Sequence, residues 1–562
     1  MKKYLSLVLM LVTVVTLAAC GNKEDNIPSF KDADLRLANS SIAEDLDFHT
    51  TSLASDFTIL NNINEGLVRL KENDEVVEGV AKSWSVSEDQ LVYTFTLRQD
   101  ATWSNGDTVT ADDFVYSWHR AVNPPEGITV KYASMYDMIK NGSAIRTGEE
   151  TDVTKLGIEA VDEYTVKVTL EQPTPYFLPL MAFPAFYPAH QETIEEYGKD
   201  YGKKMDNLIY NGPFKVTYWN TDYGVYLEKN ETYWDKDAVK IESVSYRAVE
   251  DPTTRLSLYD ADELDRVGVT GEQYEDRMDV ADVYIDPVQW YLIFNTEDEN
   301  FSNKNLRLAF KYGIDKAELV QALKPYVPAD EFVPRGYSVM EVEGEYVDFR
   351  DFVTANADAT EVNYDESTNG IFDAKVAQDY LDLALNELGE DSITVKFKAF
   401  DSDGWKPLFE NIRNQLSRLE GLTVELDKKP AAGVYDSYDG RTYEFGFYGW
   451  GPDYPDPMSF LELYHSEDSH NVLKKEETDV LNAEFDALIE AARGDNPETS
   501  LLDDPVARWE ALVQAEALLL EEAYVVPLAQ RAGGTLQQGR VSGVIKHNFG
   551  PDYSWKWVEV TD

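Results

Sequence analysis

The stretch from Tyr443 to His465, YEFGFYGWGPDYPDPMSFLELYH, constrains the possible fold more than any other part of this chain. Its first residues alternate, which predicts a β-strand with Tyr443, Phe445 and Phe447 on one face. The prolines of the following GWGPDYPDP each fix their own φ and favour an extended residue before them. We therefore expect a stiff loop that leaves the end of a strand and carries Asp453 among aromatic side chains.

Two interpretations of this loop are open from its residues alone. The carboxylate of Asp453, with Trp450 and Tyr454 as walls, suits the capture of a cationic group. Gly449 and Gly451 lack a Cβ and would let another backbone come close. The competing interpretation is an ordinary Pro-rich turn in which Asp453 only helps to reverse the chain.

The same stretch resembles the GW-x-x-D-Y-x-x-P-x-x-F-L segment of bacterial oligopeptide-binding proteins, the extracellular receptors of peptide ABC importers. The resemblance implies that Asp453 binds the α-amino group of a peptide, with main-chain peptide contacts near Gly449 and Gly451. It covers essentially the whole chain from position 31, in segments that occur in family order. Some relatives carry an arginine where this chain has a phenylalanine at position 447, so the preferred peptide length stays open.

Two further segments supply candidate ligand contacts. In the family, the chain around Ser52 to Ala54 passes the ligand cleft, so the resemblance implies backbone pairing with a peptide there. Tyr132, in KYASMY, matches a tyrosine that faces the peptide in the family, although a core tyrosine is an equally good interpretation. Thr110 with Asp113 resembles a capping box that opens a helix, and we interpret that region as scaffold.

A chain of 562 residues is too long for one core, and its length suggests about three or four domains. The resemblance implies an α/β, two-lobed periplasmic-binding-protein-like fold with hinge-linked mixed-sheet lobes and an extra peripheral domain. The expected segments are a signal peptide (1–19), a tether (20–30), a first lobe (31–64 with 189–289 and 534–562), a peripheral domain (65–188) and a second lobe (290–533).

The N-terminus has the pattern of an exported protein. Lys2 and Lys3 precede an apolar run that ends in Leu-Ala-Ala-Cys at Cys20, which is typical of a signal peptide. This ending resembles the bacterial lipobox and implies cleavage before Cys20 and a lipid on its sulfur. The competing transmembrane anchor would need about 20 apolar residues, and the run is short for that. We expect a lipid-anchored protein on the extracellular face of the bacterial cell membrane.

Enzyme signatures are missing from the sequence, which contains no G-x-x-x-x-G-K-[ST], H-E-x-x-H or G-x-S-x-G. We expect a binding protein without a cofactor or metal, which captures extended oligopeptides between its lobes and delivers them to importer permease subunits. The alternative is a receptor of the same fold for a metal complex, haem or an oligosaccharide. His465 and His470 hint at a metal site, but their spacing is not a usual ligand spacing. We expect a monomer.

Acidic residues outnumber basic ones by 104 to 50, a formal net charge of -54. Such a field repels nucleic acid, which we exclude as a partner. The surface is adapted to saline or alkaline surroundings, or it is that of a generically acidic exported protein; composition does not separate these interpretations.

If the surface is adapted to salt, the thermal stability of the protein should depend on the salt concentration. Screening lengths fall from about 30 Å at ~0.01 M to about 3 Å at ~1 M salt, so self-repulsion should weaken. We expect the melting temperature of the soluble chain to rise by several degrees over this range, equally in NaCl and KCl, in differential scanning calorimetry. An unchanged melting temperature would remove the main support for adaptation.

Overall fold

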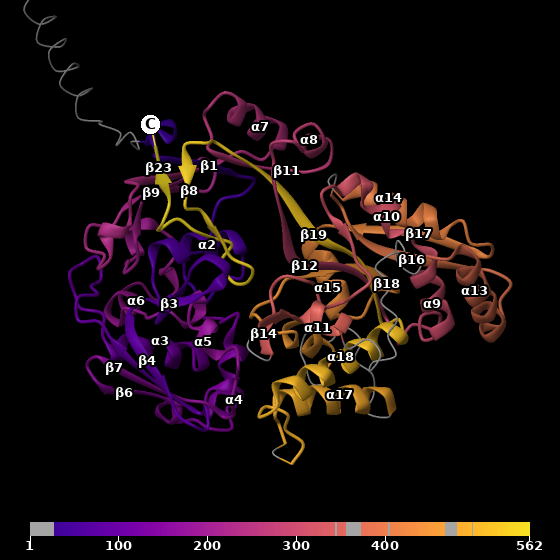
Figure 1. Cartoon of the computed structure of the whole chain (residues 1–562), viewed down its shortest axis with the longest axis horizontal. Coiled ribbons are helices and arrows are strands. Elements are labelled where there is room, and N and C mark those ends of the chain that lie inside the picture. The colour runs from indigo at the N-terminus through magenta and orange to yellow at the C-terminus, as the bar shows by residue number, and fades with distance from the viewer. Residues whose placement is uncertain are drawn as a thin grey trace, which may run out of the picture.

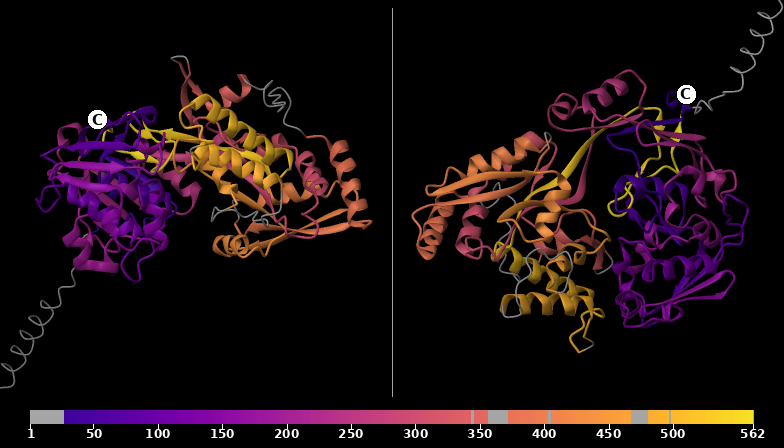
Figure 2. Two further views of the ribbon diagram at one scale, coloured as in Figure 1. Left: turned by 90° about the horizontal axis from the view of Figure 1, so that it is seen from below. Right: turned by 180° about the vertical axis from the view of Figure 1, so that it is seen from behind.

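The computed structural model describes residues 27–342, 345–355, 372–402, 405–466, 480–496 and 498–561. Figure 1 shows two bodies joined by the long strands β12 (Asp282–Phe294) and β19 (Val525–Gln537). The rear view in Figure 2 shows the same connection. The first body holds the indigo-to-magenta elements and the C-terminal end, and the second holds the orange and most of the yellow elements. The predicted signal peptide and Cys20 lie outside the described residues.

The first body contains two four-stranded sheets. One is mixed, in the order β1-β10-β9-β8 with β1 parallel to β10, and the other is antiparallel, in the order β4-β5-β7-β6. The strands are β1 (Leu35–Asn39), β2 (Val68–Leu70), β3 (Val76–Glu78), β4 (Ala81–Val86), β5 (Val92–Leu97), β6 (Ile158–Asp162), β7 (Thr165–Thr169), β8 (Phe214–Asn220), β9 (Gly224–Lys229) and β10 (Ser243–Ala248). The helices are α2 (Ala54–Ile63), α3 (Ala111–Val122), α4 (Gly142–Thr147), α5 (Phe177–Leu180) and α6 (Gln191–Tyr197).

Local sequence signals predict much of this body. The capping box is confirmed, because the Thr110 N–H donates to Asp113 Oδ2 at 2.8 Å where α3 begins. The alternation of residues 161–170 predicts one strand with Val166, Val168 and Leu170 on one face. These three are buried, but the predicted start is wrong, because residues 161 and 162 belong to β6 and a turn separates them from β7. The turn is stabilised by Asp162, whose Oδ1 accepts the Tyr164 N–H at 2.9 Å, and Val161 on β6 is 52% exposed.

The second body is built on a seven-stranded mixed sheet in the order β11-β19-β12-β18-β16-β17, with β13 also pairing with β19. The remaining strands of this body and of the C-terminal segment are β11 (Arg266–Val269), β13 (Val327–Pro328), β14 (Val339–Val342), β15 (Glu345–Asp348), β16 (Ile393–Phe400), β17 (Leu422–Lys429), β18 (Phe445–Trp450), β20 (Val541–Ser542), β21 (Ile545–Lys546), β22 (Tyr553–Ser554) and β23 (Glu559–Val560). The helices that follow α6 are α7 (Pro252–Asp260), α8 (Gly271–Glu275), α9 (Lys304–Gly313), α10 (Lys316–Leu319), α11 (Phe349–Ala355), α13 (Ala374–Leu388), α14 (Lys406–Leu416), α15 (Ala431–Asp439), α16 (Met458–Leu461), α17 (Val480–Arg493) and α18 (Pro505–Glu521).

In the second body, the observed helix ends agree with those predicted from the sequence, whereas the observed strands are longer than predicted. In the sequence, Asp373 as an N-cap and Gly389 as a stop predict a helix between them. Both are confirmed: the Asp373 carboxylate accepts the N–H groups of Lys375 and Val376, and Gly389 ends α13 at a φ of 76°. Short apolar runs in the sequence predict strands at 290–295 and 524–528. These ranges match only the inner parts of β12 and β19. The outer part of β12 carries the exposed Val283 and Ile285, so it lacks the burial pattern of a core strand. The acidic region 337–370 has no clear period, and its sequence therefore predicts a long excursion without regular structure. This prediction is wrong for its described part, which contains β14, β15 and α11.

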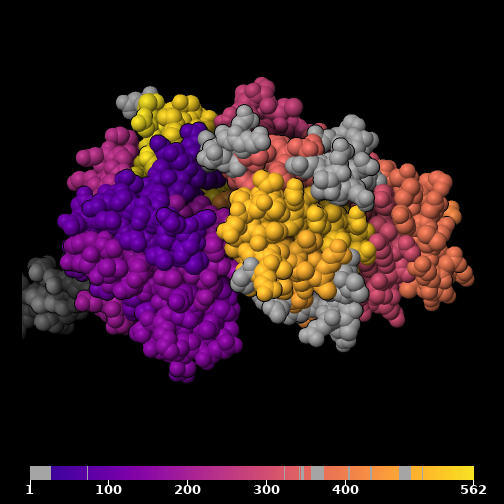
Figure 3. All heavy atoms as spheres, turned by 60° about the horizontal axis from the view of Figure 1, so that its bottom comes forward, coloured from indigo at the N-terminus to yellow at the C-terminus, as the bar shows by residue number. Residues whose placement is uncertain are grey.

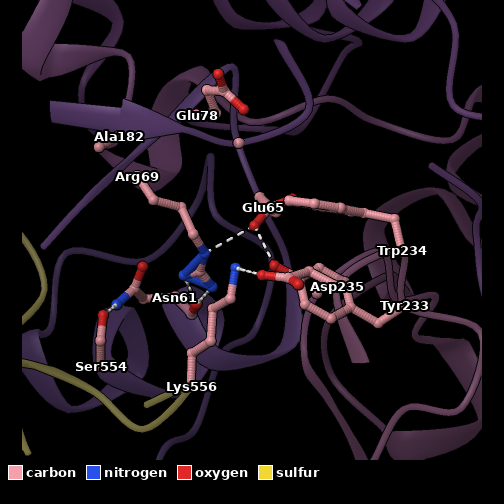
Figure 4. A network of polar contacts seen from close by, with 12 residues as sticks. Asn61, Glu65, Arg69, Glu78, Ala182, Tyr233, Trp234, Asp235, Ser554 and Lys556 are labelled. Carbon is pink, nitrogen blue, oxygen red and sulfur yellow. Dashed lines mark hydrogen bonds and ion pairs between the residues drawn. The ribbon is translucent and has the colours of Figure 1, made fainter. Parts of the chain in front are cut away.

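A buried carboxylate joins distant segments of the first body (Figure 4). Glu65 is fully buried and accepts hydrogen bonds from Arg69 Nε at 2.8 Å, the Tyr233 hydroxyl at 2.5 Å and Trp234 Nε1 at 2.5 Å. Lys556, in the C-terminal segment, pairs with the adjoining Asp235 at 2.7 Å. The segment after α2, the β9–β10 region and the C-terminal segment are thus held together by charges that are compensated inside the protein.

Burial of Lys311 in α9 predicts a pH effect on stability. Burial lowers the pKa of Lys311 from 10.5 to about 8, while its Nζ donates to the Leu520 carbonyl at 2.7 Å. Between pH 8 and pH 10.5, Lys311 has therefore lost its proton in the folded state but still carries it in the unfolded state. Stability of the wild type relative to Lys311→Met should therefore rise from pH 8 to 10.5, by up to about 3 kcal/mol. Urea unfolding of both proteins across this range measures it, and parallel pH profiles would contradict it.

Candidate ligand-binding site

A cavity of about 760 Å³ lies between the two bodies. The first body lines it with residues that include Ser52, Tyr132 and Tyr176, and the second with Trp450, Asp453 and others. The space-filling view of Figure 3 shows the purple surface of the first body beside the yellow surface of the second. The cavity volume is typical of a site for a small molecule or short peptide.

The structure brings most of the predicted ligand contacts together. Residues 52, 132, 450, 453 and 454 all line this one cavity, although they come from three separate regions of the sequence. Ala54 is the exposed first residue of α2, and Gly449 and Gly451 lie at the end of β18; these three are not among the lining residues. For all eight predicted residues, contact with a ligand stays a prediction.

The loop after β18 is held by one residue of α16. Trp450 ends the strand opposite Gln289 of β12. Its Nε1 donates to the Ser459 carbonyl at 2.9 Å, and the Asp453 N–H donates to Ser459 Oγ at 2.9 Å. Because both ends of the short loop bond to the same residue, the partly buried Asp453 has a defined position at the cavity wall.

A buried ion pair anchors the next part of the loop. Arg508 of α18 donates to both oxygens of Asp456, at 2.7 and 2.9 Å, and both side chains are almost fully buried. The same guanidinium donates through Nε to the Ala492 carbonyl of α17 at 2.7 Å. The loop is thereby fixed to α18 through a planar, bidentate contact, and the same guanidinium ties it to α17.

Tyr132 combines the two roles that the sequence left open. Its ring packs against Phe57 and Phe183, with centroids 5.6 and 5.2 Å away, so it belongs to the aromatic core. It also lines the cavity and lies close enough to Asp453 for that charge to act on it. Burial, and secondly the Asp453 carboxylate, raise the pKa of Tyr132, so its hydroxyl stays protonated and able to donate.

Packing within the protein explains why position 449 is a glycine. A Cβ there would lie 2.3 Å from ring carbons of Trp290, which stacks on Phe447 with centroids 5.1 Å apart. A Cβ at Gly451 would lie 3.1 Å from Val288. Internal packing against β12 therefore accounts for the lack of a side chain at Gly449.

Sequence reasoning missed Tyr176 as a site residue. Its ring, from the first body, stacks directly on that of Tyr454 from the second, with centroids 4.0 Å apart and an interplanar angle of 14°, and both rings line the cavity. Its sequence context, PTPYF, indicated only the end of a strand, because nothing local shows which residue lies opposite. His465 also lines the cavity, while His470 lies outside the described residues. Within the described residues, no three His, Cys, Asp or Glu side chains are grouped to hold a metal ion.

Two α/β bodies joined by a pair of strands, with an aromatic and polar cavity between them, define a protein that encloses a ligand. Comparison with known proteins gives the family: the chain belongs to the bacterial extracellular solute-binding proteins, family 5, whose model matches residues 75–471. The chain is 32% identical to the dipeptide-binding protein DppE of Bacillus subtilis, over 88% of this chain and 86% of DppE.

Two solved structures are similar over nearly the whole chain. One is the substrate-binding domain of an oligopeptide ABC transporter from Bacillus anthracis, with a TM-score of 0.79 and 35% identity, covering 93% of this chain and 98% of that one. The other is Listeria monocytogenes OppA bound to peptide, with a TM-score of 0.78 and 33% identity, covering 94% and 98%. The predicted fold class is confirmed, and the family consists of binding proteins and not enzymes. Among the described helices, none has the length and apolar character needed to span a bilayer.

The packing at Gly449 predicts that one added methyl group destabilises the folded protein. We expect Gly449→Ala to lower the free energy of unfolding by about 1–3 kcal/mol, because the new Cβ overlaps the Trp290 ring. Gly433→Ala in α15 is the matched control, since its Cβ would only touch Lys429 side-chain carbons at 3.6 Å. It should be neutral or stabilising. Equal stabilities of the two variants in urea titration would contradict this account.

Proposed function

We propose that this solute-binding protein captures oligopeptides in extended form between its two bodies and passes them to the permease subunits of an ABC importer. The observation that carries the proposal is the position of Asp453, on a stiff loop at the wall of the cavity between the bodies. The names of the relatives support it, since one is a dipeptide-binding protein and another was solved with a peptide bound.

Asp453 is proposed to receive the α-ammonium group of the peptide. A hydrogen bond to a charged group contributes about 1.5–3 kcal/mol net, and more is lost when one partner stays buried alone. Trp450 and Tyr132 border the same cavity, so aromatic faces and a tyrosine hydroxyl surround the bound ammonium. Because Ser459 holds the loop through contacts within the protein, little ordering cost is left for binding.

Backbone contacts are proposed to hold the rest of the peptide. Ser52 and Ala54 on the first body and Gly449 and Gly451 on the second would pair with an extended main chain, which gives affinity without reading sequence. The chain is further proposed to act as a monomer, anchored through a lipid on Cys20 to the extracellular face of the cell membrane. The non-peptide alternative is not favoured, because the relatives compared above are named for peptides.

Loss of the Asp453 charge should weaken peptide binding. We expect Asp453→Asn to bind tri- to penta-alanine at least about tenfold more weakly than the wild type, in isothermal titration calorimetry. N-acetylated versions should bind the wild type poorly and should not distinguish it from the variant. Asp401→Asn, an exposed carboxylate away from the cavity lining, is the matched control and should bind like the wild type. Equal affinity of the wild type for acetylated and free peptides would remove Asp453 from this role.

The masses of ligands that co-purify with the protein test the class of ligand directly. Native mass spectrometry of the soluble chain, as purified, should show a series of co-purified short peptides. A single discrete non-peptide mass would contradict the proposed function.

A further inference from the structure

An aromatic contact joins the two bodies directly. Tyr176, just before α5 of the first body, stacks on Tyr454, in the loop after β18 of the second, with ring centroids 4.0 Å apart. The rings are nearly parallel, with an interplanar angle of 14°. In Figure 1, α5 lies below the connecting strands, on the side of the first body that faces α18. The contact is therefore made away from the strands that join the bodies.

The first body holds Tyr176 in a fixed position. Pro173 and Pro175 restrict the backbone that leads to it. The next residue, Phe177, is fully buried and packs on Tyr93 of β5 with ring centroids 4.5 Å apart. Because the backbone is restricted on one side and anchored in the core on the other, the half-buried Tyr176 ring projects from a rigid site.

The second body holds Tyr454 equally firmly. Tyr454 is buried, and its hydroxyl donates a hydrogen bond to the carboxylate of Glu462. Its carbonyl accepts the N–H of Asp456 at 2.8 Å, and Asp456 is the residue that Arg508 fixes to α18. Burial, and secondly the Glu462 carboxylate, raise the pKa of Tyr454, so its hydroxyl stays protonated and keeps the bond to Glu462.

The stack changes what Tyr454 can offer to a ligand. One face of its ring is covered by Tyr176, and its hydroxyl is engaged by Glu462. A wall for a cationic group needs an open ring face. The structure thus gives Tyr454 a contact that requires no ligand, namely the one with the other body.

We propose that Tyr176 and Tyr454 form a latch that holds the two bodies closed whether or not a peptide is bound. Each ring is fixed to a different body, so the rings can stay stacked only while the bodies are closed. Opening returns apolar ring surface to water and loses the stacking contact, which favours the closed state. For a bound peptide the inference rests on the proposed function: the latch acts on opening, so it slows release more than it affects capture.

Single-molecule fluorescence energy transfer tests the latch without any ligand. Cys20 is the one cysteine of the chain, so the soluble chain that begins after it can carry dyes at Glu149→Cys and Glu498→Cys. Both positions are exposed and follow segments that line the cavity from opposite bodies. We expect Tyr176→Ala to shift the peptide-free equilibrium about two- to tenfold toward the open state, the range that one aromatic pair supplies.

Three further variants separate the loss of stacking from other changes. Tyr176→Phe keeps a flat ring and should behave like the wild type. Tyr176→Leu keeps apolar volume without a flat ring, so it should open as Tyr176→Ala does, and it decides the matter if the alanine variant folds poorly. Tyr223→Ala is the matched control, because it removes an exposed tyrosine of the first body outside the cavity lining. It should leave the equilibrium unchanged.

Stopped-flow kinetics measures the consequence for a ligand. The probe is tetra-alanine with a fluorophore at its C-terminus, displaced by an excess of unlabelled peptide. We expect it to leave Tyr176→Ala about two- to tenfold faster than the wild type, while the association rate constant changes less than about twofold.

The two measurements give separate outcomes. An unchanged peptide-free equilibrium in both Tyr176→Ala and Tyr176→Leu overturns the latch, as does a loss of peptide affinity that lies entirely in the association rate. If the peptide-free equilibrium shifts but no alanine peptide binds the wild type, the proposed function fails while the latch stands.

Discussion

The buried pair of Asp456 and Arg508 is the interaction on which the ligand site depends. Such a pair adds little net stability, because desolvation offsets most of the attraction. Its importance is geometric: two parallel hydrogen bonds fix the loop after β18 to α18, and a third bond reaches α17. Loss of either partner would leave a buried charge uncompensated, at a cost of about 3–5 kcal/mol. The position of Asp453, three residues earlier, follows from this anchor and from the two bonds to Ser459.

The sequence predicted those parts of the site that local chemistry determines. Glycines, prolines and an alternating strand placed Asp453 on a stiff loop at a strand end, and the capping residues of α3 and α13 marked their helices. What it could not supply were contacts across the fold. Tyr176 meets Tyr454 although 278 positions separate them (454 minus 176), and the Trp290 ring decides the glycine at 449. The outer half of β12 escaped detection because its apolar side chains are exposed.

The connecting strands link the site to the rest of the molecule. β12 carries the Trp450 partner Gln289 within the second body, and a register shift against β19 lies between Ile285 and Gln289. A bulge bends a strand and interrupts its pairing, so it concentrates bending at one place. Asp286, inside this interval, is paired with Lys546 of the C-terminal segment. The bulge is therefore attached to the first body, and rotation of the second body about it would move Trp450 and Asp453 together.

Net charge and local charge act on a peptide in opposite ways. A formal charge of -54 attracts the ammonium end of a peptide and repels its carboxylates. At physiological salt the field is screened within about 8 Å, so what decides binding inside the cleft is the nearest charge. Asp453 adds to the global attraction, whereas a carboxylate needs a local cation to enter.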